Sequence, residues 1–495
     1  MEERFMASTA VPRAWWRHAG PALALVLHAV IFLGIFQLHF HDGERRRIES
    51  SIPGGAGIGA GVEAILRERG PLGLVIWFFD RHGEIRLFHR YASVMLYGID
   101  PGQPADATDQ GRLRPYRDVP VEYQPGALLV LLPPFLYGRD FAAYRTGFVV
   151  WCGVLYLGTL LLGLRLLADG RPITAAQANR ALWGSAAFLL CFGGLAGARF
   201  DHVVPLLCVV GGILFQRASR ANSTPWFAVF GALAAAGVLV KIVPGVLIPA
   251  ALLWLCAAVP RTLWRAGGAV LAGFVVTLLV LNLAFYAIWG DGYVRSFTYH
   301  MDRGIQIEST YAGALMAGDG FGQPISVGRS HAAAGLETPY TGLVKSLSGP
   351  LFLALVGAIA WRFLALRRAL PPAARDLAVL LLGTVLLLAF ILTNKVFSPQ
   401  YLLWLGPLFA LAYGFRPRLA PAVLALLLAS ALTQAIFPVF YRQLKELRAP
   451  LIVLLNLRNL ILVALLAWLG WTLAKRLGEE PVAIEPTRDR LTADR

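Results

Sequence analysis

The residues of this chain that could carry out chemistry are a few carboxylates and cations set between long apolar runs. Three of the carboxylates are Asp80, Glu84 and Asp201, the last in an Arg-Phe-Asp triplet. A carboxylate within hydrogen-bond reach of a hydroxyl can accept its proton as a general base. If the first two share one helix they also share a face, because residues i and i+4 are neighbours on a helix.

The cations stand near the ends of apolar runs. Lys241 is flanked by apolar residues on both sides, where a charge is costly unless it is paired or functional. His300 and Arg303 follow a run that ends near Trp289, and Lys395 follows another. Charge-assisted hydrogen bonds from such side chains are the strong contacts to phosphate. We expect these four residues to bind a phosphate group of a substrate.

The stretch RPYRDVPVEYQP (114–125) places four charges, two tyrosines and three prolines before an apolar run. Proline-rich polar segments usually fix backbone geometry. Asp118 and Glu122 could orient an acceptor or hold the loop through the two arginines of the stretch. We expect Tyr116, Tyr123 and the distant Gln400 to help position substrate or loop.

Composition indicates that lipid is the solvent of this chain. Hydrophobic residues make up 57% and charged residues 15%, whereas a soluble domain carries about 25% charged residues. The mean hydropathy is +0.61. The four cysteines lie in apolar runs, which argues against a disulfide framework or a cysteine metal site. The net charge of +16 is typical of basic cytoplasmic loops, so no nucleic-acid partner is expected.

Apolar runs of about 17 to 25 residues, the length that spans a bilayer, recur along the chain. No internal repeat or soluble domain is evident, so we treat residues 1–495 as a single membrane-embedded domain. The sequence predicts an all-α polytopic integral membrane protein with about twelve transmembrane helices. We place them near residues 21–39, 143–164, 182–198, 203–216, 226–240, 242–258, 266–289, 347–365, 377–393, 401–415, 419–438 and 450–474.

The side of the membrane on which each loop lies depends on GALLVLLPPFLYG (126–138). Its apolar core is short and contains two adjacent prolines, so we interpret it as a segment that dips into the membrane without crossing. Most basic clusters then lie on the side of the N-terminus, which the positive-inside rule makes cytoplasmic. Both termini, including the tail 475–495, are then cytoplasmic. Two long loops, 40–142 and 290–345, face outside, and we expect them to contain short amphipathic helices.

The outer face thus collects the carboxylates and cations described above. ATP and nucleotide sugars are absent there, so a transferase on this face needs a donor that arrives through the membrane. A lipid-linked donor is the natural candidate, with cations for its leaving phosphate.

Five motifs in order along the chain strengthen this expectation. They are GEIRLFHRYA (83–92), RPYRDVPVEYQPGALLVLLPP (114–134), ARFD (198–201), LVKIVPGVLIPAALL (239–253) and TNKVFSPQYLLWLGPL (393–408). Together they resemble the motifs of the polytopic GT-C-type glycosyltransferases, in particular the mannosyltransferase-like glycosyltransferase family 87. The matches cover residues 80 to 410.

The resemblance implies an inverting glycosyltransferase in the cell membrane, with its active site on the outer face. Its donor would be a polyprenyl-phosphate sugar, mannose or related, and its acceptor a lipid or glycan. The family's catalytic aspartate falls on Glu84, which makes Glu84 the candidate base, with Asp80 as the alternative and Asp201 as a second carboxylate. The chain departs from the family pattern at Phe88, where the family has tyrosine, and at Gln124, where it has proline.

Each assignment has a structural alternative. Glu84 could be a solvated carboxylate, Asp201 a salt-bridge partner, Lys241 a snorkelling side chain, and Lys395 an ordinary helix-end lysine. A divalent metal could bind the carboxylates, but no ligand spacing demands one and no cofactor is implied. A membrane transporter or a flippase for lipid-linked sugars is the main alternative function, and a non-catalytic scaffold is another.

Overall fold

The structure, a computed structural model, describes residues 10–39, 44, 47–48, 58–80, 83–102, 112–258, 263–331, 333–365 and 375–478. These residues are mostly helical, and they also form one three-stranded sheet. The last helix continues to Gly478, four residues into the predicted tail. The rest of that tail lies outside the described residues.

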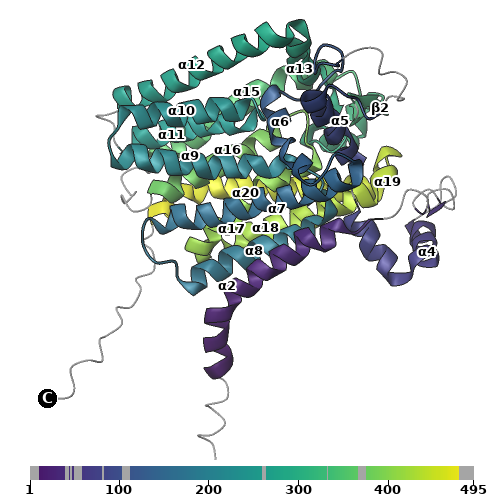
Figure 1. Cartoon of the computed structure of the whole chain (residues 1–495), viewed down its shortest axis with the longest axis horizontal. Helices are drawn as coiled ribbons and strands as arrows, with labels where there is room; N and C mark the ends of the chain where they lie inside the picture. The colour runs from purple at the N-terminus through teal and green to yellow at the C-terminus, as the bar shows by residue number, and fades with distance from the viewer. Residues whose placement is uncertain are drawn as a thin grey trace, which may run out of the picture.

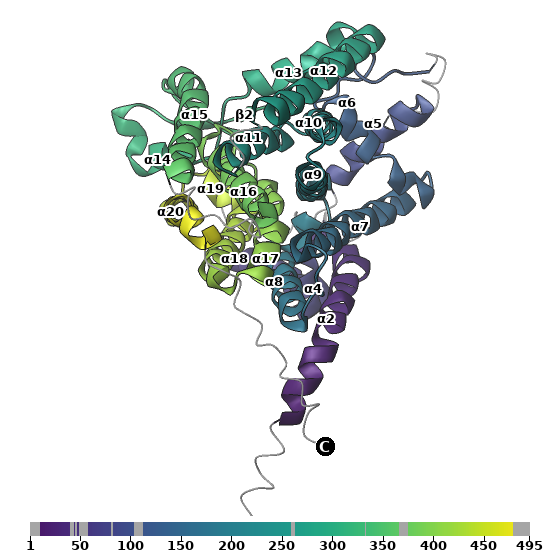
Figure 2. The same ribbon diagram turned by 90° about the vertical axis from the view of Figure 1, so that its left-hand side faces the viewer.

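Twelve helices, one on each predicted span, form the bundle that Figures 1 and 2 show from the side and from one end. They are α2 (Ala10–Leu33), α7 (Phe141–Ala168), α8 (Ala175–Phe192), α9 (Val203–Arg220), α10 (Thr224–Val238), α11 (Leu247–Ala258), α12 (Leu263–Trp289), α15 (Thr341–Ala365), α16 (Arg375–Thr393), α17 (Gly406–Phe415), α18 (Ala420–Gln434) and α20 (Ala449–Gly478).

Seven of these helices, within the described residues, are long and apolar enough to cross a membrane. They are α2, α7, α9, α12, α15, α18 and α20, taken with adjoining turns. Helices α10, α11 and α16 form shorter apolar stretches. At a rise of about 1.5 Å per residue, the 15 residues of α10 give about 22 Å, less than the ~30 Å hydrocarbon core. The predicted class, an all-α membrane protein, is therefore confirmed, whereas twelve crossings are not shown.

The outermost helices carry a surface suited to lipid. Only 6% of the apolar window of α12 is buried inside the protein. Its large apolar side chains are open, with Leu283 59% and Val276 58% exposed. In contact with water a continuous apolar surface of this kind would be an aggregation hazard, whereas in a bilayer it faces hydrocarbon.

Both long loops gather at one end of the bundle, to the right in Figure 1. The first contains α4 (Ile58–Phe79), α5 (Gly83–Tyr97) and α6 (Pro125–Val130), and the second contains α13 (Asp291–Asp302) and α14 (Thr310–Ala317). The segment 126–138 forms α6 and a 3-10 turn at Pro133–Leu136. Six helical residues give about 9 Å, too short for a span, which fits a segment that does not cross.

A small antiparallel sheet in the second loop was not predicted. Strands β1 (Ile305–Gln306), β2 (Ser326–Ser330) and β3 (Ala333–Glu337) lie in the order β1-β3-β2. The sequence SVGRSHAAAGLE is rich in small residues and lacks the apolar-polar alternation that indicates a strand. A second hydrophobic core, which includes Ile305 and Leu336, packs this loop against Leu451 and Leu455 of α20.

Glu308 is a carboxylate enclosed beside this second core, only 2% exposed. Burial raises its pKa from the ordinary 4.5 to about 7. The folded protein therefore binds this proton more tightly than the unfolded chain, and the free energy of unfolding should fall as the pH rises from about 4.5 to about 7. Between pH 5 and pH 8 we expect the ionisation of Glu308 alone to lower the free energy of unfolding by about 2 kcal/mol.

Unfolding in detergent at pH 5 and pH 8, for wild type and Glu308→Gln, measures this effect. The variant should lack this part of the decrease, because a glutamine does not titrate. If the free energy of unfolding depends on pH in the same way in both proteins, Glu308 is not the group responsible.

Candidate active site

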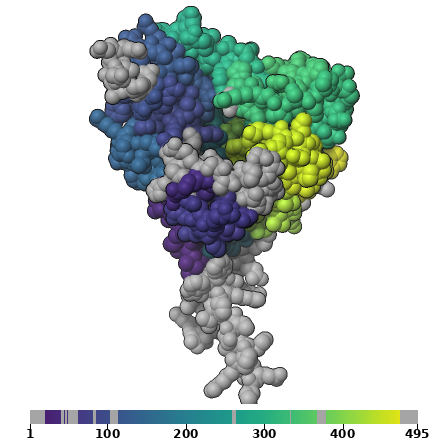
Figure 3. Space-filling model, turned by 90° about the vertical axis from the view of Figure 1, so that its right-hand side faces the viewer, coloured from purple at the N-terminus to yellow at the C-terminus, as the bar shows by residue number. Residues whose placement is uncertain are grey.

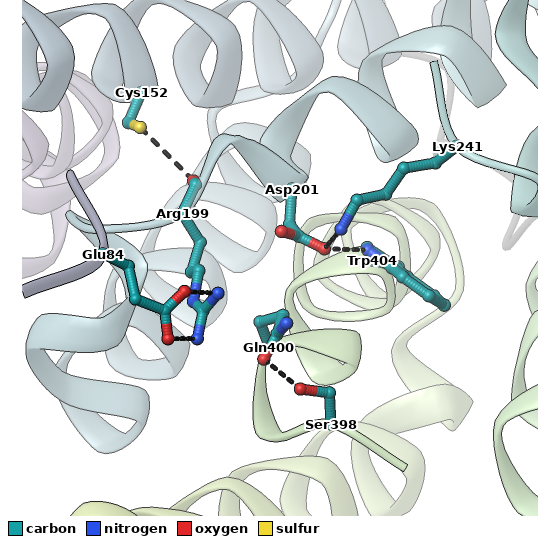
Figure 4. Close-up of polar contacts among 8 residues, drawn as sticks. All are labelled: Glu84, Cys152, Arg199, Asp201, Lys241, Ser398, Gln400 and Trp404. Carbon is teal, nitrogen blue, oxygen red and sulfur yellow. Dashed lines mark hydrogen bonds and ion pairs between the residues drawn. The ribbon is translucent and has the colours of Figure 1, made fainter. Parts of the chain in front are cut away.

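Asp201 is the central carboxylate of the site. It lies on a 3-10 turn (Phe200–His202) that leads into α9. Its Oδ1 accepts hydrogen bonds from Lys241 Nζ at 2.5 Å and from Trp404 Nε1 at 2.8 Å (Figure 4). The Asp201 and Lys241 side chains are only 1% and 13% exposed, so they form a buried ion pair. Figure 4 shows the second oxygen of Asp201 directed away from these two donors.

Lys241 reaches Asp201 because the chain breaks at this point. Helix α10 ends at Val238, and a 3-10 turn at Val243–Val246 precedes α11. The lysine therefore does not lie inside a continuous helix, although apolar residues flank it on both sides. Its ammonium is occupied by Asp201, which favours a structural role over the predicted contact with phosphate.

Glu84 is held by Arg199. It lies in the first turn of α5, and its two oxygens meet both terminal nitrogens of the guanidinium in a bidentate ion pair (Figure 4). The Arg199 side chain is 8% exposed, whereas that of Glu84 is 41% exposed. A carboxylate has about four acceptor positions, so Glu84 keeps free ones on its open side.

Asp80 does not share a helix with Glu84. Helix α4 ends at Phe79 and α5 begins at Gly83, so the condition for a common helical face is not met. Asp80 is 3% exposed at the end of α4. An acceptor has much easier access to Glu84.

An aromatic cluster joins three of the sequence motifs. Phe88, Tyr123 and Phe200 are mutual neighbours, with ring centroids 5.4 to 6.0 Å apart. Lys241 Nζ lies 4.9 Å from the centroid of the Phe200 ring. Motifs more than a hundred residues apart in sequence therefore meet in one place.

The stretch 114–125 is held mainly by its own contacts. Tyr116 adopts a left-handed φ of 65°, and its hydroxyl donates to the Tyr123 carbonyl at 2.6 Å. The Asp118 carboxylate accepts from the backbone N–H of Arg114 at 2.7 Å, not from a guanidinium. A side chain at Gly292 would begin 2.1 Å from the Tyr116 carbonyl oxygen, so only glycine permits this approach of α13. Tyr116 and Asp118 thus hold the loop.

Glu122 faces the interior of the site. Its carboxylate and burial together raise the pKa of the Tyr299 hydroxyl, burial having the larger effect. Its backbone carbonyl accepts a hydrogen bond from His300 Nε2 at 2.8 Å. Glu122 has no ion-pair partner among the described residues, which makes it a third carboxylate available to a ligand.

His300 is not a cation at neutral pH. Burial, and then the charge of Arg303, lower its pKa to about 4. Because a carbonyl can only accept, Nε2 must donate to Glu122 and Nδ1 keeps a lone pair. This differs from the prediction of a positively charged phosphate ligand.

A group of cations lies at the C-terminal end of α13. Lys395 Nζ donates to the Met301 carbonyl at 2.6 Å, and Lys345 Nζ donates to the Asp302 carbonyl at 2.8 Å. The last carbonyls of a helix carry partial negative charge, which explains why lysines gather there. Arg303 follows directly and forms no hydrogen bond or ion pair within the part of the chain that the structure describes. We call Arg303, Lys345 and Lys395 the cation group.

These cations perturb one another. Burial, and then the charges of Lys345 and Arg303, lower the pKa of Lys395 to about 8. Like charges at close range are unfavourable unless an anion lies between them. The arrangement is therefore suited to a phosphate.

Gln400 lies between the two ion pairs in Figure 4. Its Oε1 accepts a hydrogen bond from Ser398 at 2.5 Å, and the residue is 8% exposed. The neighbouring Tyr401 lies within electrostatic reach of Arg303, Arg199 and Asp201. The cation group and the carboxylates therefore belong to one site.

This site lies at the loop end of the bundle. Figure 3 looks at that end and shows the surface hollowed between the blue atoms of the first loop and the yellow-green atoms of the C-terminal part. No cluster of three or more metal-ligating side chains occurs in the described ranges.

No protein-family model, curated protein or solved structure matches the chain. The resemblance to glycosyltransferase family 87 therefore depends on the motifs alone and stays a prediction.

Three residues of the candidate site were not predicted from the sequence. Arg199 lies two residues before Asp201 in the sequence, but in the structure it pairs with Glu84, 115 residues away. Trp404 and Lys345 carried no signal of their own, since a tryptophan in an apolar run and a loop lysine are common. Only the place of Trp404 within the last motif could have indicated its role.

Proposed function

We propose that this protein is a membrane glycosyltransferase. It moves a sugar, mannose or a related hexose or pentose, from polyprenyl phosphate to a hydroxyl of a lipid or glycan. The observation that carries this proposal is the state of Arg303. Its guanidinium is half-buried and has no partner among the described residues. It also lies within electrostatic reach of Tyr401, as Asp201 does. Because Arg303 forms no ion pair within the described residues, its guanidinium is free to bind a ligand phosphate through charge-assisted hydrogen bonds.

In the proposed reaction, the acceptor hydroxyl attacks the anomeric carbon of the donor. Its proton passes to Glu84, the new glycosidic bond forms, and the bond from the anomeric carbon to the phosphate oxygen breaks. Polyprenyl phosphate leaves with its charge held by Arg303 and Lys395. Glu84 is the preferred base because its carboxylate is the open one, 41% exposed against 1% for Asp201.

The remaining residues position the reactants. Asp201 and Lys241 form a fixed pair beside the Phe200 ring. Neutral His300 offers Nδ1 as an acceptor for a sugar hydroxyl. We therefore assign His300 to binding of the sugar and not, as the sequence predicted, to binding of the phosphate. Arg199 holds Glu84 in place.

The proposed orientation puts this site on the outer face of the cell membrane, with twelve crossings and both termini in the cytoplasm. Single cysteines placed at exposed positions of the second loop test it. A membrane-impermeant thiol reagent added to intact cells should label a cysteine at Ser326 but not one at Ala221, where α9 ends. The reverse pattern would contradict the orientation and with it the donor class.

The enzymatic proposal is tested with purified protein in lipid nanodiscs. Radiolabelled polyprenyl-phosphate sugars are supplied one by one, together with extracted membrane lipids and glycans as acceptors. We expect label to move from one of these donors. If a folded, correctly oriented protein consumes none of them, the proposal fails.

The cation group gives the reaction a distinctive pH dependence. In the free protein the pKa of Lys395 is about 8, so this lysine loses its charge above that pH. We expect kcat/KM for the donor to fall above about pH 8, because kcat/KM reports groups of the free enzyme. Lys395→Arg keeps the charge and should remove this decline. An unchanged alkaline limb in the variant would exclude Lys395 from phosphate binding.

A further inference from the structure

Arg458 is a buried cation inside the last membrane-spanning helix. It lies on α20 and is 1% exposed. A charge at such a position is costly unless it is paired, which makes the residue a candidate for a functional role. None of the contacts described above for the site involves this residue.

Two segments of the site meet at this arginine. Its Nη2 donates to the Glu308 carbonyl at 2.6 Å, just after strand β1. Its guanidinium lies 3.9 Å from the centroid of the Phe397 ring, two residues after Lys395. One side chain therefore contacts both the second loop and the segment 394–398.

These two segments are also bonded directly to each other. The Gln306 N–H of β1 donates to the Lys395 carbonyl at 3.0 Å, and the Tyr311 hydroxyl donates to the Thr393 carbonyl at 2.8 Å. The Lys395 side chain then reaches back to Met301. The separation of Arg303 and Lys395 thus depends on how these segments are held together, and Arg458 of α20 contacts both of them.

A guanidinium is suited to this position. Its planar fork can donate a hydrogen bond at one edge while its face lies on an aromatic ring, which an ammonium cannot do with the same geometry. Nε and Nη1 have no hydrogen-bond partner among the described residues. An apolar residue would serve better if packing alone were required, because leaving buried donors unpaired is unfavourable.

We propose that Arg458 is a positioning residue which fixes segment 394–398 against the second loop and so sets the spacing of the phosphate-binding cations Arg303 and Lys395. This inference rests on the proposed function for its kinetic consequence. Its structural consequence, the bonding of Gln306 to Lys395, can be measured without any activity.

Arg458→Met and Arg458→Lys test the proposal in the full-length protein. With the donor found active in the panel, we expect the donor KM to rise about tenfold in both variants, with kcat changed less than twofold. Hydrogen exchange of the peptide that contains the Gln306 amide should become at least tenfold faster. If KM and exchange both stay at the wild-type values, Arg458 has no positioning role.

Asn456→Leu is the matched control. Asn456 lies on the same helix and donates to the Gly313 carbonyl of the second loop at 2.9 Å, but it forms no hydrogen bond with segment 394–398. It should leave the donor KM unchanged. An equal rise in KM for Asn456→Leu would mean that any loosening of α20 suffices, which overturns the specific role.

Phe397→Leu removes the aromatic partner of Arg458 in the same contact. It provides a second test if Arg458→Met does not fold. We expect a similar rise in donor KM, and less than additive effects in the double variant, as for residues in contact. Fully additive effects would refute a shared role. If wild type transfers no sugar from any donor, the proposed function fails, and hydrogen exchange alone decides whether Arg458 holds the segment.

Discussion

Glu84→Gln should lower kcat by about 10²- to 10⁴-fold, the usual contribution of a general base. The amide is nearly isosteric and can still accept a hydrogen bond from Arg199, so the loop should keep its place. Its oxygen is too weakly basic to take the acceptor proton, so the loss should fall on kcat and leave the donor KM nearly unchanged. The measurement is steady-state transfer from the active donor.

Glu446→Gln is the control for this variant. Glu446 is also a partly exposed carboxylate paired with arginines, Arg442 and Arg448, with 35% side-chain exposure against 41% for Glu84. It lies outside the site and should leave kcat unchanged. If Glu84→Gln transfers sugar at a near-normal rate, Glu84 is not the base. Glu122, which forms no ion pair among the described residues, then becomes the next candidate.

Asp201→Asn should destabilise the protein by about 3–5 kcal/mol, the usual effect of removing one partner from a buried ion pair. Lys241 would remain as a charge with 13% exposure, without its counter-ion. Trp404 would also lose its charge-assisted acceptor. Unfolding in detergent at pH 7 measures this change.

The double variant Asp201→Leu/Lys241→Met separates charge from packing. Replacing both members of a buried pair by apolar residues is often neutral or stabilising. We therefore expect it to recover most of the stability that Asp201→Asn loses. A stability change below about 1 kcal/mol for Asp201→Asn would contradict the buried pair.

The helices could be predicted from the sequence because apolar length is a strong local signal. All twelve predicted spans coincide with helices, and the proline pair at 133–134 correctly marked a short, broken segment. The number of crossings could not be predicted in the same way. Lys241 and Pro244 divide one apolar stretch into two short helices, and whether such helices cross depends on their neighbours.

The site was only partly predictable for a related reason. Carboxylates and cations could be identified one by one, but their partners are set by packing between distant segments. Arg199 and Glu84 are 115 residues apart, and Asp201 and Trp404 are 203 residues apart. The burial that makes His300 neutral likewise depends on contacts that no local pattern reveals.

The most direct test of the central claim is a single-turnover experiment. Protein in excess is mixed with the active radiolabelled polyprenyl-phosphate sugar and acceptor, and the rate of label transfer is followed for wild type and Glu84→Gln. We predict one exponential phase with inversion at the anomeric carbon in wild type, slowed about 10²-fold or more in the variant. Equal rates in the two proteins, or retention at the anomeric carbon, would contradict direct transfer from polyprenyl phosphate by a carboxylate base.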